Sequence, residues 1–118
     1  MTAQKETLNR RIIGALQGLK LPVVPQVDTK HREKCITFNY DEIPFQFAGN
    51  RPSWYKALIQ VHLLYPVGEN SIVIRRSVLS ALTKAGFSWP ELIDASDEDT
   101  QHFIFETEAI TPIEETGG

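Results

Sequence analysis

The sequence contains few of the residues that form metal sites, disulfides or reactive centres. Its 118 residues include one cysteine, Cys35, and three histidines, His31, His62 and His102. A single cysteine excludes a disulfide within the chain, and no two histidines have the i, i+4 spacing of a helical zinc-binding pair. We therefore predict no metal and no cofactor. We interpret Cys35, which lies in an alternating segment, as a small apolar strand residue rather than as a nucleophile.

Long apolar runs and an excess of positive charge are also missing. The longest apolar run covers residues 63–67, far short of the roughly 20 residues that span a bilayer. The first residues lack the apolar segment of a secretory signal. A net charge of −3 supplies no dominant basic stripe for nucleic acid. We expect a soluble cytoplasmic protein.

Catalytic motifs are missing as well. The sequence has no glycine-rich phosphate loop, no Gly-x-Ser-x-Gly motif and no paired carboxylates in an apolar frame. Residues 94–99 resemble a calcium loop only loosely, because the required glycine and closing glutamate are absent. This segment is either a solvated loop or an acidic surface that meets a basic partner. We expect that the chain is not an enzyme and has no catalytic residues.

Two segments have the periodicity of amphipathic helices. Apolar residues recur at intervals of three and four in residues 2–19, and Pro22 stops this helix from continuing. The second helix begins at a cap provided by Asn70 or Ser71 and ends before Gly86, which suits a left-handed C-terminal position. The apolar stripes consist of Leu8, Ile12, Ala15, Leu16 and Leu19 in the first helix and of Ile74, Val78, Ala81, Leu82 and Ala85 in the second.

Other segments have the alternation and composition of strands. The expected strands are residues 23–24, 35–40, 45–47, 54–65 and 102–107. The expected turns are residues 41–44 and 49–52, and a longer connection begins at Trp89. Strand 23–24 is limited by prolines on both sides, so we place it at an edge of the sheet.

This order of elements predicts an α+β fold. A small, mainly antiparallel sheet of four to five strands would carry two principal helices packed on one face, which buries both apolar stripes. The domain covers residues 1–110, and residues 111–118 form a flexible C-terminal tail. The uncovered face of the sheet would be only partly polar, and this favours association with a partner.

Charged and aromatic residues supply the candidate contacts for such a partner. The cation pairs on the two helices are either solvated or meet carboxylates across an interface, and the two tryptophans are either core residues or interface anchors. The candidate interface residues are Arg32, Lys34, Arg51, Trp54, Arg75, Arg76, Asp97, Glu98 and Asp99.

The ordered features of residues 8–109 resemble the tail terminator, or tail completion, proteins of bacteriophages and prophages. A helix leads into Leu-Lys-Leu-Pro-Val at residues 19–23, and the strand Ile-Thr-Phe at residues 36–38 precedes Tyr40 and Pro44. Three further segments match: Gln-Val-His-Leu-Leu-Tyr at 60–65, Leu-Thr-Lys-Ala-Gly-Phe at 82–87, and Asp-Glu-Asp-Thr at 97–100 before His-Phe-Ile-Phe at 102–105.

The resemblance implies a structural virion assembly protein. Such a subunit forms a ring, a homohexamer on the tail, that caps the tail tube, stops its elongation and provides the surface for head–tail joining. Its partners would be copies of itself, the tail tube protein and the head-completion or connector protein, with DNA only passing through the lumen. It would reside in the virion tail at the head–tail junction, and in the host bacterial cytoplasm during assembly.

Two other interpretations of the sequence stay open at this point. The chain is also of a size for another phage neck or head–tail connector component. From a different functional class, a small non-catalytic α+β ligand-binding domain has the same composition. A ring of tail-like symmetry distinguishes the terminator from a stable monomer that a small molecule protects against heat.

Overall fold

The computed structural model describes residues 7–25, 34–48 and 51–112, which form two helical segments and a five-stranded sheet. The elements in chain order are α1 (Leu8–Leu16) with a 3-10 turn (Gln17–Leu19), β1 (Val23–Pro25), β2 (Cys35–Ala48), β3 (Arg51–Pro66), α2 (Ile72–Lys84), β4 (Glu91–Asp94) and β5 (Thr100–Pro112). None of the helices in these ranges is long and apolar enough to cross a membrane.

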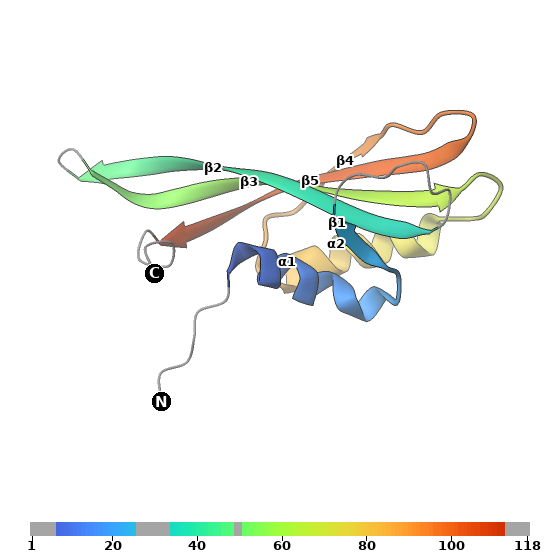
Figure 1. Ribbon diagram of the computed structural model, residues 1–118, viewed down its shortest axis with the longest axis horizontal. Helices are drawn as coiled ribbons and strands as arrows, with labels where there is room; N and C mark the ends of the chain where they lie inside the picture. Colours follow the sequence, from blue (N-terminus) through green and yellow to red (C-terminus); the bar gives the residue numbers. More distant parts are fainter. Residues whose placement is uncertain (1–6, 26–33, 49–50, 113–118) are drawn as a thin grey trace.

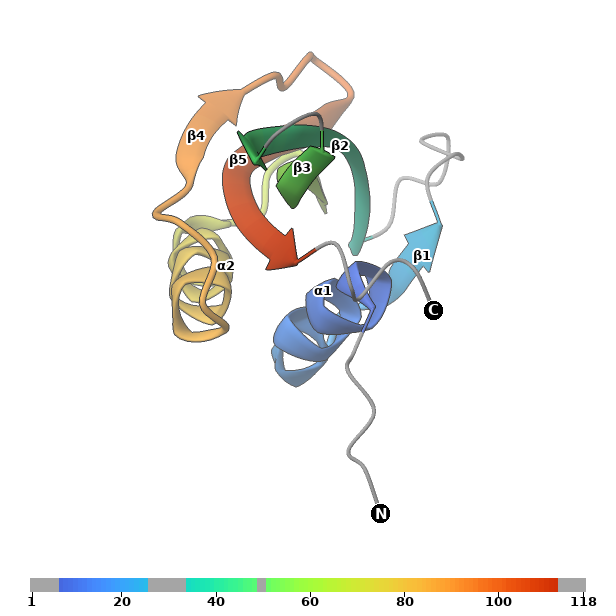
Figure 2. The same ribbon diagram turned by 90° about the vertical axis from the view of Figure 1, so that its left-hand side faces the viewer.

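The sheet has the strand order β1-β2-β3-β5-β4, in which β1 runs parallel to β2 and the other neighbours are antiparallel. Both helices lie on the same face of the sheet (Figures 1 and 2). The predicted α+β fold, with a mainly antiparallel sheet and two helices on one face, is therefore confirmed. The other face of the sheet, called the outer face below, carries no helix (Figure 2).

The core lies between the helices and the inner face of the sheet. Alternate residues of β3 point into it, as the alternation of residues 54–65 predicts, and so do alternate residues of β5. The residues that are fully or almost fully buried there include Ile12 and Leu16 of α1, Val78 and Leu82 of α2, Ile59, Val61 and Leu63 of β3, and Phe103 and Phe105 of β5. Each such side chain contributes roughly 1.5–3 kcal/mol of burial free energy.

The ends of the helices are set by local hydrogen bonds. The Thr7 hydroxyl accepts the Arg10 amide (3.2 Å), so α1 begins at Leu8, and the expected residues 2–6 lie outside the described residues. At α2 the Asn70 side chain accepts the Ile72 amide (2.9 Å), whereas the Ser71 side chain makes no capping bond. Gly86 adopts φ +95° and Phe87 donates its amide to the Leu82 carbonyl, so the predicted left-handed end of α2 is confirmed.

The predicted turn at residues 41–44 is wrong, because β2 runs without interruption through these residues. Asp41 pairs with Leu58 and Pro44 pairs with Tyr55 in the antiparallel ladder with β3. Pro44 lacks an amide donor, but β1 reaches only as far as Phe38 on the other side of β2. In the described residues β2 is therefore an edge strand from there on, where a proline is tolerated.

Three further boundaries differ from those expected. β3 begins at Arg51, so Arg51 and Pro52 belong to the strand rather than to a turn. Residues 91–94 form the short strand β4, which lies inside the expected connection after Trp89. β5 extends through Thr111 and Pro112, which pair with Tyr55 and Trp54. The rest of the expected tail, residues 113–118, lies outside the described residues.

We predict that the two faces of the sheet respond differently to the same substitution. Ile59→Ala on the inner face, where Ile59 is 1% exposed, should lower the free energy of unfolding by about 2–5 kcal/mol through lost burial and a cavity. Ile110→Ala on the outer face, where Ile110 is 50% exposed, should lower it by about 1 kcal/mol or less. Urea unfolding of both variants measures this, and equal losses would contradict the assignment of the two faces.

Candidate functional site

The outer face of the sheet carries side chains in rows that cross β2, β3 and β5. The strand register places Thr37, His62 and Ile104 in one row, Asn39, Gln60 and Glu106 in the next, then Asp41, Leu58 and Glu108, and finally Ile43, Lys56 and Ile110. β4 extends two of these rows, because Ile93 pairs with Ile104 and Glu91 pairs with Glu106. The row of Asn39, Gln60 and Glu106 is therefore entirely polar, whereas the rows on either side of it combine polar and apolar residues.

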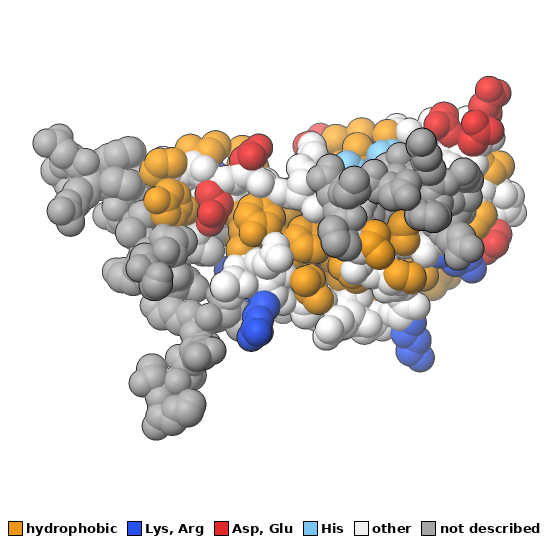
Figure 3. Space-filling model, viewed as in Figure 1, with side chains coloured by type: hydrophobic (Ala, Val, Ile, Leu, Met, Phe, Trp, Pro, Cys, Tyr) orange, Lys and Arg blue, Asp and Glu red, His pale blue; other side chains and the backbone are white. Residues whose placement is uncertain are grey.

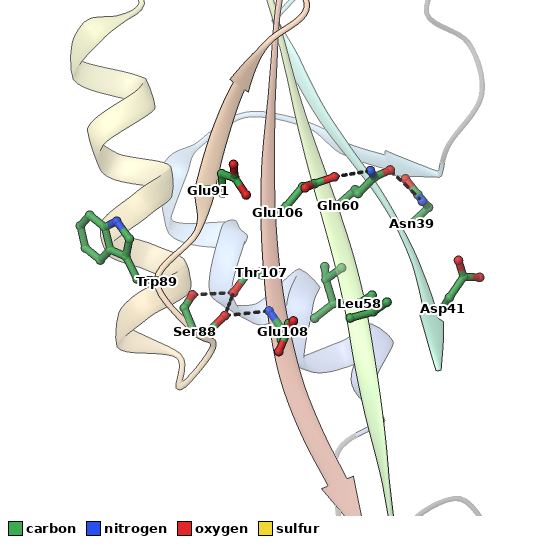
Figure 4. A pocket seen from close by; sticks show the side chains of 11 residues that line it. Asn39, Asp41, Leu58, Gln60, Ser88, Trp89, Glu91, Glu106, Thr107 and Glu108 are labelled. Atoms are coloured by element: carbon green, nitrogen blue, oxygen red, sulfur yellow. Dashed lines mark hydrogen bonds between the residues drawn. The ribbon is translucent and has the colours of Figure 1, made fainter. Parts of the chain in front are cut away.

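Four of these side chains and His102, which pairs with Leu64 at the next outer position of the register, form a continuous hydrogen-bonded chain, called the polar ladder below. His102 and His62 are joined through Nε2 and Nδ1 at 2.8 Å, and His62 Nε2 lies 3.0 Å from Asn39 Oδ1. Asn39 Nδ2 donates to Gln60 Oε1 (3.3 Å), and Gln60 Nε2 donates to Glu106 Oε2 (2.8 Å). The end of the ladder from Asn39 to Glu106 crosses three strands (Figure 4).

The ladder has one direction when both histidines are neutral. Asn39 Oδ1 can only accept, so His62 Nε2 carries a hydrogen and its Nδ1 accepts from the Nε2–H of His102. Every donor then points from His102 toward the carboxylate of Glu106. Hydrogen bonds aligned in this way polarise one another and hold the side chains in one arrangement.

Burial keeps the histidine pair neutral near pH 7. Desolvation lowers the pKa of His62, and the neighbouring His102 lowers it further. Desolvation also lowers the pKa of His102, although the nearby Asp97 carboxylate acts in the opposite direction. Two rings in contact can share one added proton between their facing nitrogens, whereas a second would place two cations side by side.

A groove lies on the outer face beside the glutamate end of the ladder. Its lining includes the amides of Asn39 and Gln60, the apolar side chain of Leu58, the segment Ser88–Trp89, and the carboxylates of Asp41, Glu91, Glu106 and Glu108. Figure 4 shows Glu91 of β4 next to Glu106 of β5, with Trp89 in the segment that leads from α2 into β4. The groove therefore combines negative charge with apolar surface.

Ser88 attaches this segment to β5. Its amide donates to the Glu108 carbonyl (3.0 Å), its side chain accepts the Glu108 amide (2.9 Å), and its carbonyl accepts a short hydrogen bond from Thr107. The backbone next to Trp89 is thus held in place, while the indole is 71% exposed. A large aromatic side chain in this position is typical of an interface anchor.

Charge of opposite sign is segregated between the two layers of the molecule. Residues 7–25 and 70–90, which contain both helices, include six cations and no carboxylate: Arg10, Arg11, Lys20, Arg75, Arg76 and Lys84. Residues 91–112, which form β4 and β5, include seven carboxylates and no Lys or Arg: Glu91, Asp94, Asp97, Glu98, Asp99, Glu106 and Glu108. Acidic side chains gather at the tip of the β4–β5 hairpin in Figure 3, and basic ones project from the helical side.

The connection between β4 and β5 is a structured hairpin loop. Asp97 Oδ1 accepts the amides of Asp99 and Thr100 (both 2.8 Å), and Asp94 Oδ1 accepts the amide of Ser96 (2.9 Å). Hydrogen bonds from Ser96 lower the pKa of Asp94, and those from the Asp99 and Thr100 amides lower the pKa of Asp97. Within residues 7–25, 34–48 and 51–112, no group of three His, Cys, Asp or Glu is arranged to hold a metal ion.

The candidate interface residues do not form one surface. Trp54 lies on β3 opposite Pro112, whereas Pro66 at the other end of β3 lies opposite Thr100, next to Asp97, Glu98 and Asp99. The tryptophan and the acidic loop therefore occupy opposite ends of the sheet. Arg51 belongs to β3, where its side chain is not described, and Arg32 lies outside the described residues.

Two of the candidate cations make contacts within the chain. Lys34 Nζ lies 2.9 Å from the Glu69 carboxylate and 5.1 Å from the Tyr65 ring centre, and the hydrogen bond to Glu69 raises the pKa of Lys34. The Arg75 guanidinium lies 4.4 Å from the Phe103 ring centre, and its Nε donates to Ser71. Arg76, by contrast, is exposed.

The polar ladder and the groove were not predicted from the sequence. His62, Gln60 and His102 each appear as single polar residues in strands, and their partners lie 21–46 positions away in the chain. Only the register of β2, β3 and β5 brings them together. The lack of carboxylates in residues 7–25 and 70–90 and the lack of Lys and Arg in residues 91–112 were visible in the sequence, and these compositions could have indicated the charge segregation.

Comparison with known proteins identifies the fold but no family. No protein-family model matches the chain, and no curated protein matches it. Among the solved structures that match, one has a TM-score of 0.55 and 12% sequence identity, and the match covers 91% of this chain and 96% of the other. The name of that protein describes no function. At this identity the likeness shows a shared fold alone.

We predict that stability falls as the pH drops below the ordinary histidine value of 6.5. The pKa values of His62 and His102 are lowered in the folded protein, so the unfolded chain binds more protons in this window and acidification favours unfolding. The melting temperature should therefore fall between pH 7 and pH 5. The double variant His62→Gln/His102→Gln should lose this slope, whereas His31→Gln, which removes the third histidine, should keep it. A wild-type melting temperature that is constant over this range would contradict the prediction.

Proposed function

We propose that this chain is a structural assembly protein of the tail terminator type. It would cap a phage tail tube as a six-fold ring, stop elongation of the tube and present the surface to which the head joins. The observation that best supports this proposal is that part of the outer face of the sheet, which carries no helix, exposes apolar side chains (Figures 2 and 3).

Three neighbouring aliphatic residues form one exposed apolar part of this face. Ile43 of β2, Leu58 of β3 and Ile110 of β5 are 45%, 38% and 50% exposed, and they belong to two neighbouring rows of the sheet. Apolar side chains that are grouped in this way on a small domain favour contact with a partner. A contact of this kind suits a protein that is completed by assembly.

The shape of the sheet supports the same proposal. The paired ends of β2 and β3 extend beyond the helices as an arm, in which β5 accompanies β3 as far as Trp54 (Figure 1). Pairing in the arm continues through Phe45 with Trp54 and Ala48 with Arg51. An arm of this kind is long enough to contact a neighbouring subunit or the end of a tube. Its second strand, β3, also passes through the centre of the sheet, so the arm is rigidly attached to the core.

The proposed mechanism is occlusion. A ring made of head-to-tail contacts uses two different patches on each subunit. It closes when the successive rotations between neighbours add up to one full turn. Seated on the tube end, the ring would cover the surfaces that another ring of tube protein needs. Its opposite side would then offer a new surface to the head-completion protein. No bond is made or broken in this process, so no catalytic residue is required.

We predict that loss of the gene changes tail length. In the phage or prophage that encodes the chain, deletion should yield overlong tubes without attached heads, because nothing stops elongation, and expression of the wild-type chain in trans should restore normal tails. Negative-stain electron microscopy of lysates measures both tube length and head attachment. Normal virions after deletion would disprove the proposal, and so would a purified chain that remains a monomer in the presence of tube ends.

A further inference from the structure

The six cations of the helical layer fall into two groups. The guanidinium groups of Arg11 and Arg75 lie over the rings of Phe87 and Phe103, at 5.0 and 4.4 Å from the ring centres, and so contribute to packing within the chain. The other four, Arg10, Lys20, Arg76 and Lys84, are exposed, and none of them pairs with a carboxylate of the described residues. The helical layer therefore presents four cations to the outside.

The carboxylates of the groove are largely unneutralised. Neither Asp41 nor Glu91 pairs with a cation in the part of the chain that the structure describes, and both are exposed. Glu106 accepts from Gln60 of the polar ladder, and Glu108 lies 3.8 Å from Lys56. The groove therefore holds negative charge at fixed positions, next to apolar surface from Leu58 and Trp89.

The chemistry of the groove fits a cationic side chain on an alkyl stem. A guanidinium or ammonium group would be held by the carboxylates, and its stem would lie along apolar surface beside the indole. The ladder holds the Glu106 carboxylate in place, so this carboxylate loses little freedom when a cation binds. The ligand class is thus an arginine- or lysine-rich protein surface.

The same chain carries such a surface on its other layer. The groove lies on the outer face and the helices cover the inner face, with the sheet between them (Figure 2). Arg76 and Lys84 lie next to Trp89 at the edge of the same chain's groove. Neither pairs with a carboxylate of the described residues, so both are available to the groove of a second copy. Two different patches on one subunit that complement each other define a head-to-tail contact.

We propose that copies of this chain associate by placing the exposed helical cations of one subunit, centred on Arg10 and Arg76, against the acidic groove of the next, centred on Asp41 and Glu91. This inference rests on the proposed function in that it names the contact that would close the ring. The aliphatic residues Ile43, Leu58 and Ile110 lie beside the groove and would be covered by the same contact. The partner is a second copy of the chain.

Charge reversal on each side, followed by mixing, tests this contact. The helix variant is Arg10→Glu/Arg76→Glu. Arg10 lies in the first turn of α1, where a carboxylate is compatible with the helix dipole, and Arg76 is at an exposed position of α2. The groove variant is Asp41→Lys/Glu91→Lys, at exposed strand positions. Each variant alone should associate at least about 100-fold more weakly than wild type, because like charges then face each other.

Mixing the two variants should restore association. The acidic helices of the helix variant then meet the basic groove of the groove variant. The unchanged basic helices of the groove variant meet the unchanged acidic groove of the helix variant. The two variants can therefore alternate in a ring with an even number of subunits. A single chain that carries all four substitutions should also associate. Sedimentation velocity at low ionic strength measures each case, and circular dichroism confirms that each variant is folded. The wild-type complex should weaken in about 0.5 M salt, where the Debye length is about 4 Å and more distant exposed charges are screened from each other.

Several results would overturn the proposal. These are a wild-type chain that stays monomeric at low ionic strength, reversed variants that associate like wild type, and a mixture of the two variants that does not associate. If a lysine substitution prevents folding, Asp41→Asn/Glu91→Gln provides a second groove variant, and it should weaken association in the same direction. A chain that caps tubes in cells but associates independently of these four charges would keep the proposed function and exclude this contact.

Discussion

The register of β3 against its two neighbours is the constraint on which the rest of the molecule depends. β3 pairs with β2 from Leu64 to Arg51 and with β5 from Pro66 to Trp54, so it is the only strand of the described sheet bonded along most of its length on both sides. Its alternate residues supply the centre of the core on one face and the centre of the polar ladder on the other. A slip of one residue would exchange the two sets, and burial of the polar set would be prohibitively costly.

The polar ladder explains how a sheet face without a helix, in the described part of the chain, keeps half-buried polar residues in order. His62 and His102 are neutral, and each directs one ring nitrogen at the other. The amides of Asn39 and Gln60 continue the chain from His62 to the charged carboxylate of Glu106. A half-buried amide or imidazole without a partner would cost free energy, whereas each of these groups has one. The ladder also ends at the groove, so the same hydrogen bonds that satisfy the face hold one of the groove carboxylates.

The separation of charge follows from the separation of segments. The helical segments contain cations and no carboxylate, and the C-terminal hairpin contains carboxylates and no Lys or Arg. The composition of each segment therefore becomes the charge of one part of the molecule when the helices pack on one face. A molecule with two such parts is suited to repeated association in one direction. This property supports the proposed ring, whereas the shared fold of a solved structure at 12% identity does not bear on function.

How much the sequence determined by itself depends on the range of the interactions involved. Amphipathic spacing, a cap at Asn70 or Ser71 and the Gly86 end signal were enough for α2, and the alternation of residues 54–65 was enough for the centre of β3, because these signals are local. The α+β class followed from the order of these elements. The break expected at Pro44 failed because an edge strand tolerates a proline, and which strand is at an edge is a property of the whole sheet. Tertiary structure alone decided that His102, His62, Asn39, Gln60 and Glu106 form one chain of hydrogen bonds, since pairing between strands far apart in the chain sets those neighbours.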